Sequence, residues 1–217
     1  MDFALTAHHH PTAETLSGHA LGGLALGPSL AVNLHLETCL TCRSKVQQIE
    51  EEEGQRMLSL PGAALASGAL ERVLARIAGV APNPVPVHTQ ALLPNDVRLP
   101  SALEKLGLSP PIHLAPDTWI AHLNAPRDGG WRTYLVCAAA DAVVPRHGHT
   151  GDEMIVVLEG GFNDGRPFAV GDFAENPTGF VHEMQVSPEG RLVALISSAG
   201  AIDWGAADRG IGAFLDI

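Results

Sequence analysis

The sequence has little positive charge. Of its 217 residues, 13 are lysine or arginine and 24 are aspartate or glutamate, so the formal net charge is −11. Contacts to nucleic-acid phosphates need clustered lysine and arginine, so this composition argues against direct binding of nucleic acid. Residues 1–88 hold 8 acidic and 5 basic residues, while residues 89–217 hold 16 and 8. The acidic excess could suit a basic protein partner, or could serve solubility alone.

Long hydrophobic runs are also missing. The longest mild stretch, from Leu21 to Leu34, is interrupted by several glycines, a proline and an asparagine. It falls short of the roughly 18 uninterrupted apolar residues that suggest a membrane span. The N-terminus has no lysine or arginine before its first apolar stretch, unlike a signal peptide. We therefore expect a cytoplasmic protein with no membrane partner.

Cysteine is scarce, with three residues, too few for a disulfide framework. Cys39 and Cys42 form a C-x-x-C close behind a histidine. In a cytoplasmic chain this pattern indicates metal or redox chemistry rather than a structural bridge. Cys137 lies apart, in an apolar run, and is expected to be a buried strand residue.

The first 80 residues have the apolar spacing of helices. The acidic block at residues 50–53 is expected to lie on a solvated helix face, and Pro61-Gly62 is a break. The last of the four segments places Leu70, Val73, Leu74 and Ile77 at helical spacing. The expected helices run from a cap at Thr12 or Ser17 to Gly22-Gly23, from Gly27-Pro28-Ser29 towards Cys39, through Val46, Ile49 and Met57, and from a cap at Ser67 over Gly68 to Ile77.

A proline-rich segment at 81–87 predicts an extended linker, because proline fixes φ and removes a backbone donor. We place the domain boundary at 81–88, between a helical domain (1–80) and a second domain (89–217). In the second, short apolar runs between Gly, Pro and Asp residues favour a sandwich or barrel. The expected strands are Thr118–Leu123, Trp131–Ala138, Glu153–Leu158, Arg166–Val170, His182–Val186, Arg191–Ser197 and Ala213–Ile217.

The first metal-binding pattern is H-x-x-x-C-x-x-C, formed by His35, Cys39 and Cys42. On one helix these residues share a face, and a turn between two helices would also let both sulfurs reach one ion. Two thiolates and an imidazole leave one position of a tetrahedral zinc shell open, for which the triplet His8, His9 and His10 supplies candidates, unless it is a loose tail. A thioredoxin-like redox pair is the alternative, but no βαβ pattern precedes these cysteines.

The second metal-binding pattern joins His147, His149 and Glu153 to the later His182. In a strand, His147 and His149 would point to the same face. His182 would arrive from a paired strand inside a closed barrel. Three imidazoles and one carboxylate suit zinc or another divalent transition metal. The intervening glycines and Pro177 are explained as turns between strands.

Residues 8–80 resemble the zinc-binding anti-sigma domain of ChrR-type regulators. That family has a histidine about 25 residues before its H-x-x-x-C-x-x-C, which selects His10 as the fourth ligand; His8, His9 and His19 are rivals, although His19 is expected to pack within the first helix. The segment 147–160 reads H-x-H-x-x-x-E-x-x-x-x-x-x-G and the segment 171–182 reads G-x-x-x-x-x-P-x-G-x-x-H. The two segments resemble the two cupin motifs. Asp141 and Val186 depart from them, standing where the family usually has Gly and Asn.

The resemblance implies an α plus β chain of two domains, a zinc-stapled helical bundle and a C-terminal double-stranded β-helix, or cupin, barrel. It further implies an anti-sigma factor that sequesters an ECF sigma factor and releases it when the cupin senses an oxidative signal. Zinc is expected in the first site, and zinc or another divalent metal in the cupin. A homodimer through the cupin domain is a further expectation. The alternative is a cupin metalloenzyme such as a metal-dependent dioxygenase; no reaction motif points to one, so no catalytic residue is assigned.

Overall fold

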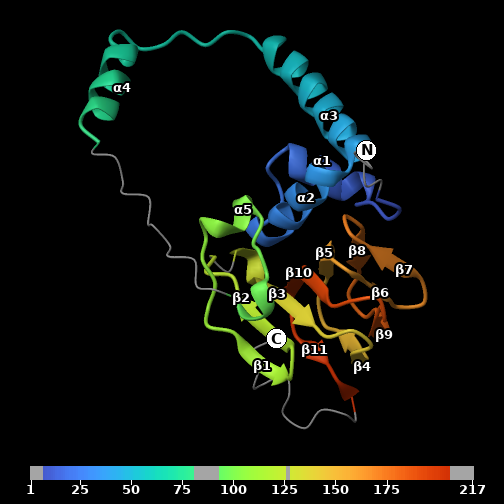
Figure 1. Ribbon diagram of the computed structural model, residues 1–217. Coiled ribbons are helices and arrows are strands. Elements are labelled where there is room, and N and C mark those ends of the chain that lie inside the picture. Colours follow the sequence, from blue (N-terminus) through green and yellow to red (C-terminus); the bar gives the residue numbers. More distant parts are fainter. Residues whose placement is uncertain (1–6, 81–92, 126–127, 206–217) are drawn as a thin grey trace, which may run out of the picture.

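The computed structural model describes residues 7–80, 93–125 and 128–205. Helices form its N-terminal part and antiparallel strands its C-terminal part, as expected (Figure 1). The predicted linker at 81–88 and the last predicted strand, Ala213–Ile217, lie outside the described residues, so the domain boundary stays a prediction. None of the described helices has the length and apolar content required to cross a bilayer. The helices are α1 (Ala13–Ala20), α2 (Leu26–Thr38), α3 (Leu40–Leu58), α4 (Ala69–Ala78), α5 (Ser101–Glu104) and the short 3-10 turns η1 (Pro94–Asp96) and η2 (Asp128–Gly130).

Local signals set the first three helices. Thr12 caps α1, because its hydroxyl oxygen accepts a hydrogen bond from the Thr15 amide at 3.2 Å, whereas the other candidate, Ser17, lies inside the helix. Pro28 lies in the first turn of α2, where its missing amide hydrogen has no intrahelical partner to lose. Cys39 ends α2 and precedes α3. The C-x-x-C therefore lies at a turn between two helices and not on one continuous helix.

The predicted cap of α4 is wrong. Gly68, not Ser67, occupies the N-cap position, with a φ of 69°. That left-handed backbone favours glycine, and it places Ser67 one residue too early to cap the helix. None of the residues of α4 is buried, and the helix stands apart from the rest of the described chain (Figure 1).

The strands form two antiparallel sheets. The six-stranded sheet has the order β1-β2-β3-β10-β5-β8, and the five-stranded sheet the order β11-β4-β9-β6-β7. The predicted run Trp131–Ala138 matches β3, and the other described predictions agree with strands to within two residues. The strands are β1 (Ile112–Ala115), β2 (Thr118–His122), β3 (Trp131–Ala138), β4 (Val143–His149), β5 (Glu153–Glu159), β6 (Gly161–Asn163), β7 (Pro167–Ala169), β8 (Phe173–Asn176), β9 (Val181–Val186), β10 (Leu192–Ala199) and β11 (Ile202–Asp203).

The central strands of the six-stranded sheet are buried on both faces, whereas its edge strand β1 is largely exposed. In β10, Ala194 and Ile196 belong to the core between the two sheets, while Val193 and Leu195 belong to the core beneath the helices. A strand covered on both sides reads as a continuous apolar run, as β10 does. The helical core is therefore shared: α2 packs against β3, β5 and β10, so the helical part rests directly on the barrel (Figure 1).

Gly27 lets α2 approach the sheet closely. A Cβ at this position would lie 2.1 Å from Thr133 Oγ1 and 2.3 Å from Ser197 Oγ, which are 3.2 Å apart and hydrogen-bonded to each other. Gly27→Val is expected to lower the free energy of unfolding by about 2–3 kcal/mol, because the larger side chain must displace both hydroxyls or the helix. Chemical denaturation would measure the loss. Gly54→Val in α3 is the control, because a Cβ there meets nothing within 4 Å; equal losses in the two variants would contradict the packing argument.

Candidate metal centres

The first candidate centre joins four side chains from the N-terminal segment and two helices. His10 precedes α1, His35 lies in the last turn of α2, and the two cysteines stand at the junction with α3 and in its first turn. One ligand atom from each lies within 4.8 Å of the others. His10 Nδ1 is 3.4 Å from Cys39 Sγ and 3.5 Å from Cys42 Sγ. The structure thus brings His10, His35, Cys39 and Cys42 around one point.

The chemistry of these donors fits a soft, tetrahedral cation. The buried Nε2 of His35 has no hydrogen-bond partner, while its Nδ1 donates to the carbonyl oxygen of Gly171 at 2.6 Å. The lone pair of Nε2 is therefore free to bind a metal. Burial lowers the pKa of His35 and so favours the neutral, ligating imidazole. Two imidazoles and two thiols form a donor set typical of structural zinc sites.

The thiol of Cys42 would release its proton when a cation binds. Burial, with a hydrogen bond to Cys39, raises the pKa of Cys42 to about 12. A thiol in such surroundings keeps its proton unless a positive ion compensates the thiolate charge. The backbone amide of Cys42, in the first turn of α3, also donates a hydrogen bond to Cys39 Sγ at 3.4 Å. The cluster could therefore hold a cation, whose positive charge would compensate the thiolates.

The rival histidines are engaged elsewhere. His9 Nε2 donates to the carbonyl oxygen of Pro167 at 2.9 Å, and its ring lies 4.4 Å from that of Phe168. His19 lies inside α1, where its Nδ1 is 3.1 Å from Ser29 Oγ. His8 and His9 are not part of the ligand group, although both are close to His10 in the chain. Ligation by His10 stays a prediction, which this geometry favours.

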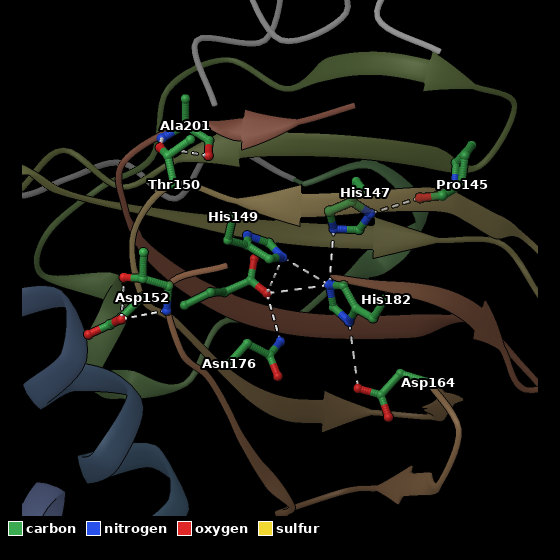
Figure 2. Close-up of polar contacts among 11 residues, drawn as sticks. Pro145, His147, His149, Thr150, Asp152, Asp164, Asn176, His182 and Ala201 are labelled. Atoms are coloured by element: carbon green, nitrogen blue, oxygen red, sulfur yellow. Dashed lines mark hydrogen bonds and ion pairs between the residues drawn. The ribbon is translucent and has the colours of Figure 1, made fainter. Parts of the chain in front are cut away.

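The second candidate centre lies inside the barrel. His147 and His149 come from β4 and His182 from the neighbouring β9, with His147 directly opposite His182 in the register. The three imidazoles converge (Figure 2), and His182 Nε2 is 3.0 Å from the Nε2 of both His147 and His149. All three side chains are buried. His147 Nδ1 donates to the carbonyl oxygen of Pro145 at 2.8 Å, which leaves its Nε2 free for a metal.

Glu153, the first residue of β5, lies at the edge of this imidazole group. Its Oε2 is 3.5 Å from His149 Nε2 and 3.9 Å from His182 Nε2, and it accepts a hydrogen bond from Asn176 Nδ2 at 3.0 Å. The three imidazole atoms lie within 4.8 Å of one another, and Glu153 is not part of that set. Ligation by Glu153 therefore stays a prediction, with a carboxylate close to two of the three imidazoles.

The surroundings of His147 and His149 favour their uncharged imidazoles. Burial, with His147 and His182 nearby, lowers the pKa of His149 to about 4, and burial also lowers the pKa of His147. Burial raises the pKa of Glu153, partly offset by its hydrogen bond from Asn176. Neutral imidazoles are ready to bind a metal, whose positive charge would stabilise the buried carboxylate. The group could hold one divalent ion.

Three residues near the barrel centre were not expected from the sequence. Asn176 contacts Glu153, Asp164 Oδ2 lies 3.6 Å from His182 Nδ1 (Figure 2), and the ring of Trp204 lies 4.9 Å from that of His147. Each comes from a short strand or a loop whose pattern carries no metal signal. The departure at Asp141 has a simple explanation: its φ is 60°, a left-handed backbone that explains why glycine is usual there.

Comparison with known proteins agrees with this two-part arrangement. Residues 109–200 match the ChrR cupin-like domain family. The anti-sigma-E factor ChrR of Cereibacter sphaeroides is 28% identical over 167 residues, which cover 74% of each chain.

A solved structure agrees over more of the length. In the crystal structure of Rhodobacter sphaeroides SigE in complex with the anti-sigma ChrR, the matching chain is 27% identical with a TM-score of 0.70, and the match covers 89% of this chain and 99% of that one. The likeness therefore extends over helices and barrel together. The chain is thus similar to ChrR in both its helical part and its barrel.

Proposed function

We propose that the chain is an anti-sigma factor, which sequesters an ECF-type sigma factor through its N-terminal helices. The observation that carries this proposal is the apolar face of α4, which no other described part of the chain covers. Leu70, Val73, Leu74 and Ile77 are 63%, 50%, 55% and 64% exposed. They recur at the i, i+3, i+4, i+7 spacing of one helix face. Exposure of such an apolar stripe to water is unfavourable in free energy. Its burial in an apolar groove of another protein would remove that unfavourable exposure.

The likeness to ChrR supports a sigma factor as the occupant of that groove. ChrR was solved as a complex with SigE, and nearly its whole chain is covered by this one. Near the end of α3 and beyond it, Met57, Leu58 and Leu60 are also exposed, so the apolar surface continues from one helix towards the next. An interface that uses α3 and α4 would bury both at once.

The two candidate centres receive separate roles in this proposal. Zinc at His10, His35, Cys39 and Cys42 holds the helices in the arrangement that binds the partner, because four protein ligands leave no open position for chemistry. Zinc or another divalent metal at His147, His149, His182 and Glu153 belongs to the part that receives the signal, for which an oxidant is the expectation. We assign residues 1–80 to the first role and 89–217 to the second, joined by 81–88.

A cupin metalloenzyme such as a dioxygenase is the alternative. Three imidazoles around one point would permit it, but a cupin fold does not by itself imply a reaction. The likeness to a regulator over both parts of the chain favours a non-enzymatic role.

Removing the barrel imidazoles separates inhibition from signal response. His147→Ala with His149→Ala is expected to lose one metal per chain and the response to the signal, yet still to inhibit transcription by the cognate sigma factor. The physical reason is that both residues lie on β4, at the side of the barrel away from α3 and α4 (Figure 1). In vitro transcription and elemental analysis would measure the two effects. Loss of inhibition in this variant, with the barrel folded, would contradict the division of roles.

A homodimer through the cupin stays a prediction. Light scattering would measure the molar mass of the free chain. A monomeric mass at the concentrations used for sigma-factor binding would contradict the homodimer.

A further inference from the structure

The turn before β8 touches the N-terminal cluster directly. Its Gly171 carbonyl oxygen accepts the hydrogen bond from His35 Nδ1, across 136 residues of sequence. Asp172 is 1% exposed, and its Oδ1 accepts hydrogen bonds from the backbone amides of His8 at 2.5 Å and His9 at 3.0 Å. Its Oδ2 accepts from the Ala169 amide at 2.8 Å, which ties the carboxylate to the barrel. A barrel residue thus holds the backbone that precedes His10.

The strand itself continues this contact along the N-terminal segment. The amide of Phe173 donates to the carbonyl oxygen of His9 at 3.0 Å, and the Phe173 ring lies edge-on to His35, with centroids 5.8 Å apart. Two residues further on, Glu175 Oε1 accepts from the amide of Thr12 at 2.9 Å. His10 is therefore anchored to β8 on both of its sides in the chain.

The other end of the same strand reaches the barrel cluster. Asn176 is 2% exposed, stands opposite Glu153 in the strand register, and donates to its Oε2. From Asp172 to Asn176 the chain is five residues long. One short, buried segment thus contacts both groups of ligand residues.

We propose that Gly171–Asn176 is an outer shell common to both metal centres, in which Asp172 is a positioning residue for His10 and Asn176 for Glu153. Outer-shell partners orient ligands, and their removal typically costs 10–100-fold in metal affinity. Through β8, a signal-driven change in the occupied barrel centre alters the geometry of the N-terminal centre and with it the arrangement of the helices, whereas a chain without the barrel imidazoles keeps the resting, inhibitory arrangement. This inference rests on the metal sites of the proposed function. It names β8 as the segment through which the barrel centre would affect the N-terminal centre.

Asp172→Ala tests the first half of the proposal. In the full-length metal-loaded chain, competition with a chromophoric chelator is expected to show a 10–100-fold weaker N-terminal zinc site. The cobalt-substituted chain supplies a second readout, because its sulfur-to-metal charge-transfer band reports on the thiolate centre alone and should shift. Asp172→Asn, which keeps one oxygen acceptor, is expected to restore part of both signals and covers the case in which the alanine variant does not fold.

Asp152→Ala is the matched control. The Oδ1 of Asp152 also accepts two hydrogen bonds, from the amide and the hydroxyl of Thr178 at 2.8 Å each, but on the barrel alone. This variant is expected to keep the wild-type zinc affinity and the wild-type cobalt band. Equal affinities in the Asp172 and Asp152 variants would overturn the role of Asp172.

A double-mutant cycle tests the link between the centres. The effect of Asn176→Ala on the cobalt band and on N-terminal affinity, expected to be about two- to thirty-fold, should vanish in a chain that already carries His147→Ala and His149→Ala. If Asn176→Ala weakened N-terminal zinc affinity by the same factor with and without the barrel imidazoles, the proposed link between the two centres would be overturned. No sigma factor enters these measurements, so the link can fail while sigma binding stands. A wild-type chain without metal at its cysteines would instead refute both the zinc site and the link.

Discussion

Replacing Cys39 and Cys42 together by serine is expected to empty the N-terminal centre and to detach α3. The hydroxyl of serine does not ionise at neutral pH and is a poor zinc ligand, so two of the four donors disappear. Structural zinc contributes about 10–16 kcal/mol of apparent folding free energy in small zinc-finger peptides. Within α3, Cys42 and Val46 are the only buried residues, so its packing against α1 and α2 buries little of the helix and the metal contributes much of what holds it in place.

The loss is expected to be local. Helix α2 has seven buried residues and packs on the sheet, so it should stay in place while α3, and α4 with it, moves freely. The expected results are one metal fewer per chain, faster hydrogen exchange in α3, an unchanged barrel, and no binding of the sigma factor. Cys137→Ala in β3 is the control, since this buried cysteine belongs to neither centre. If the serine variant still bound and inhibited the sigma factor, the N-terminal zinc site would have no role in partner recognition.

Local patterns predicted the first four helices and six of the described strands, because the causes of these elements are local, but they did not predict β1, β4, β6, β8 and β11. The run Trp131–Ala138 has the composition of a buried strand and forms β3, and the cap at Thr12 needs no more than the following turn of helix. The junction at Cys39 was one of two open geometries, and only the path of the chain after α2 decides between them. For His10, the resemblance selected the residue among three neighbours. The structure adds a reason: His9 contacts the barrel and leaves His10 to face the cysteines.

The contacts that join the two parts could not be read from the sequence. The strand β8 has four residues with an apolar beginning and a polar end, too short for an alternating pattern to be recognised. Asp172 looks like a turn residue until the N-terminal segment is placed against it. The proline-rich segment at 81–87 suggested two separate units, whereas the apolar core under α2 is continuous with the outer face of the barrel sheet. Partnerships across more than a hundred residues depend on the folded arrangement, and these carry the regulatory inference.

The double substitution Leu70→Asp with Leu74→Asp places two carboxylates on the apolar face of α4. It is expected to weaken sigma-factor binding at least about 100-fold. Each leucine that is buried in a complex contributes roughly 1.5–3 kcal/mol, and 1.4 kcal/mol is a tenfold change in Kd. A carboxylate in the same apolar groove adds the cost of its desolvation.

The fold of the free chain should not change, because both leucines are more than half exposed and neither belongs to a described core. Titration calorimetry would measure Kd, and circular dichroism the helix content. Ala75→Asp with Arg76→Ala changes the charge of the polar side of α4 by the same amount, and this control should bind as the unaltered chain does. Undiminished binding by the leucine variant would show that the exposed stripe of α4 has some other purpose, and the proposed function would lose the observation that carries it.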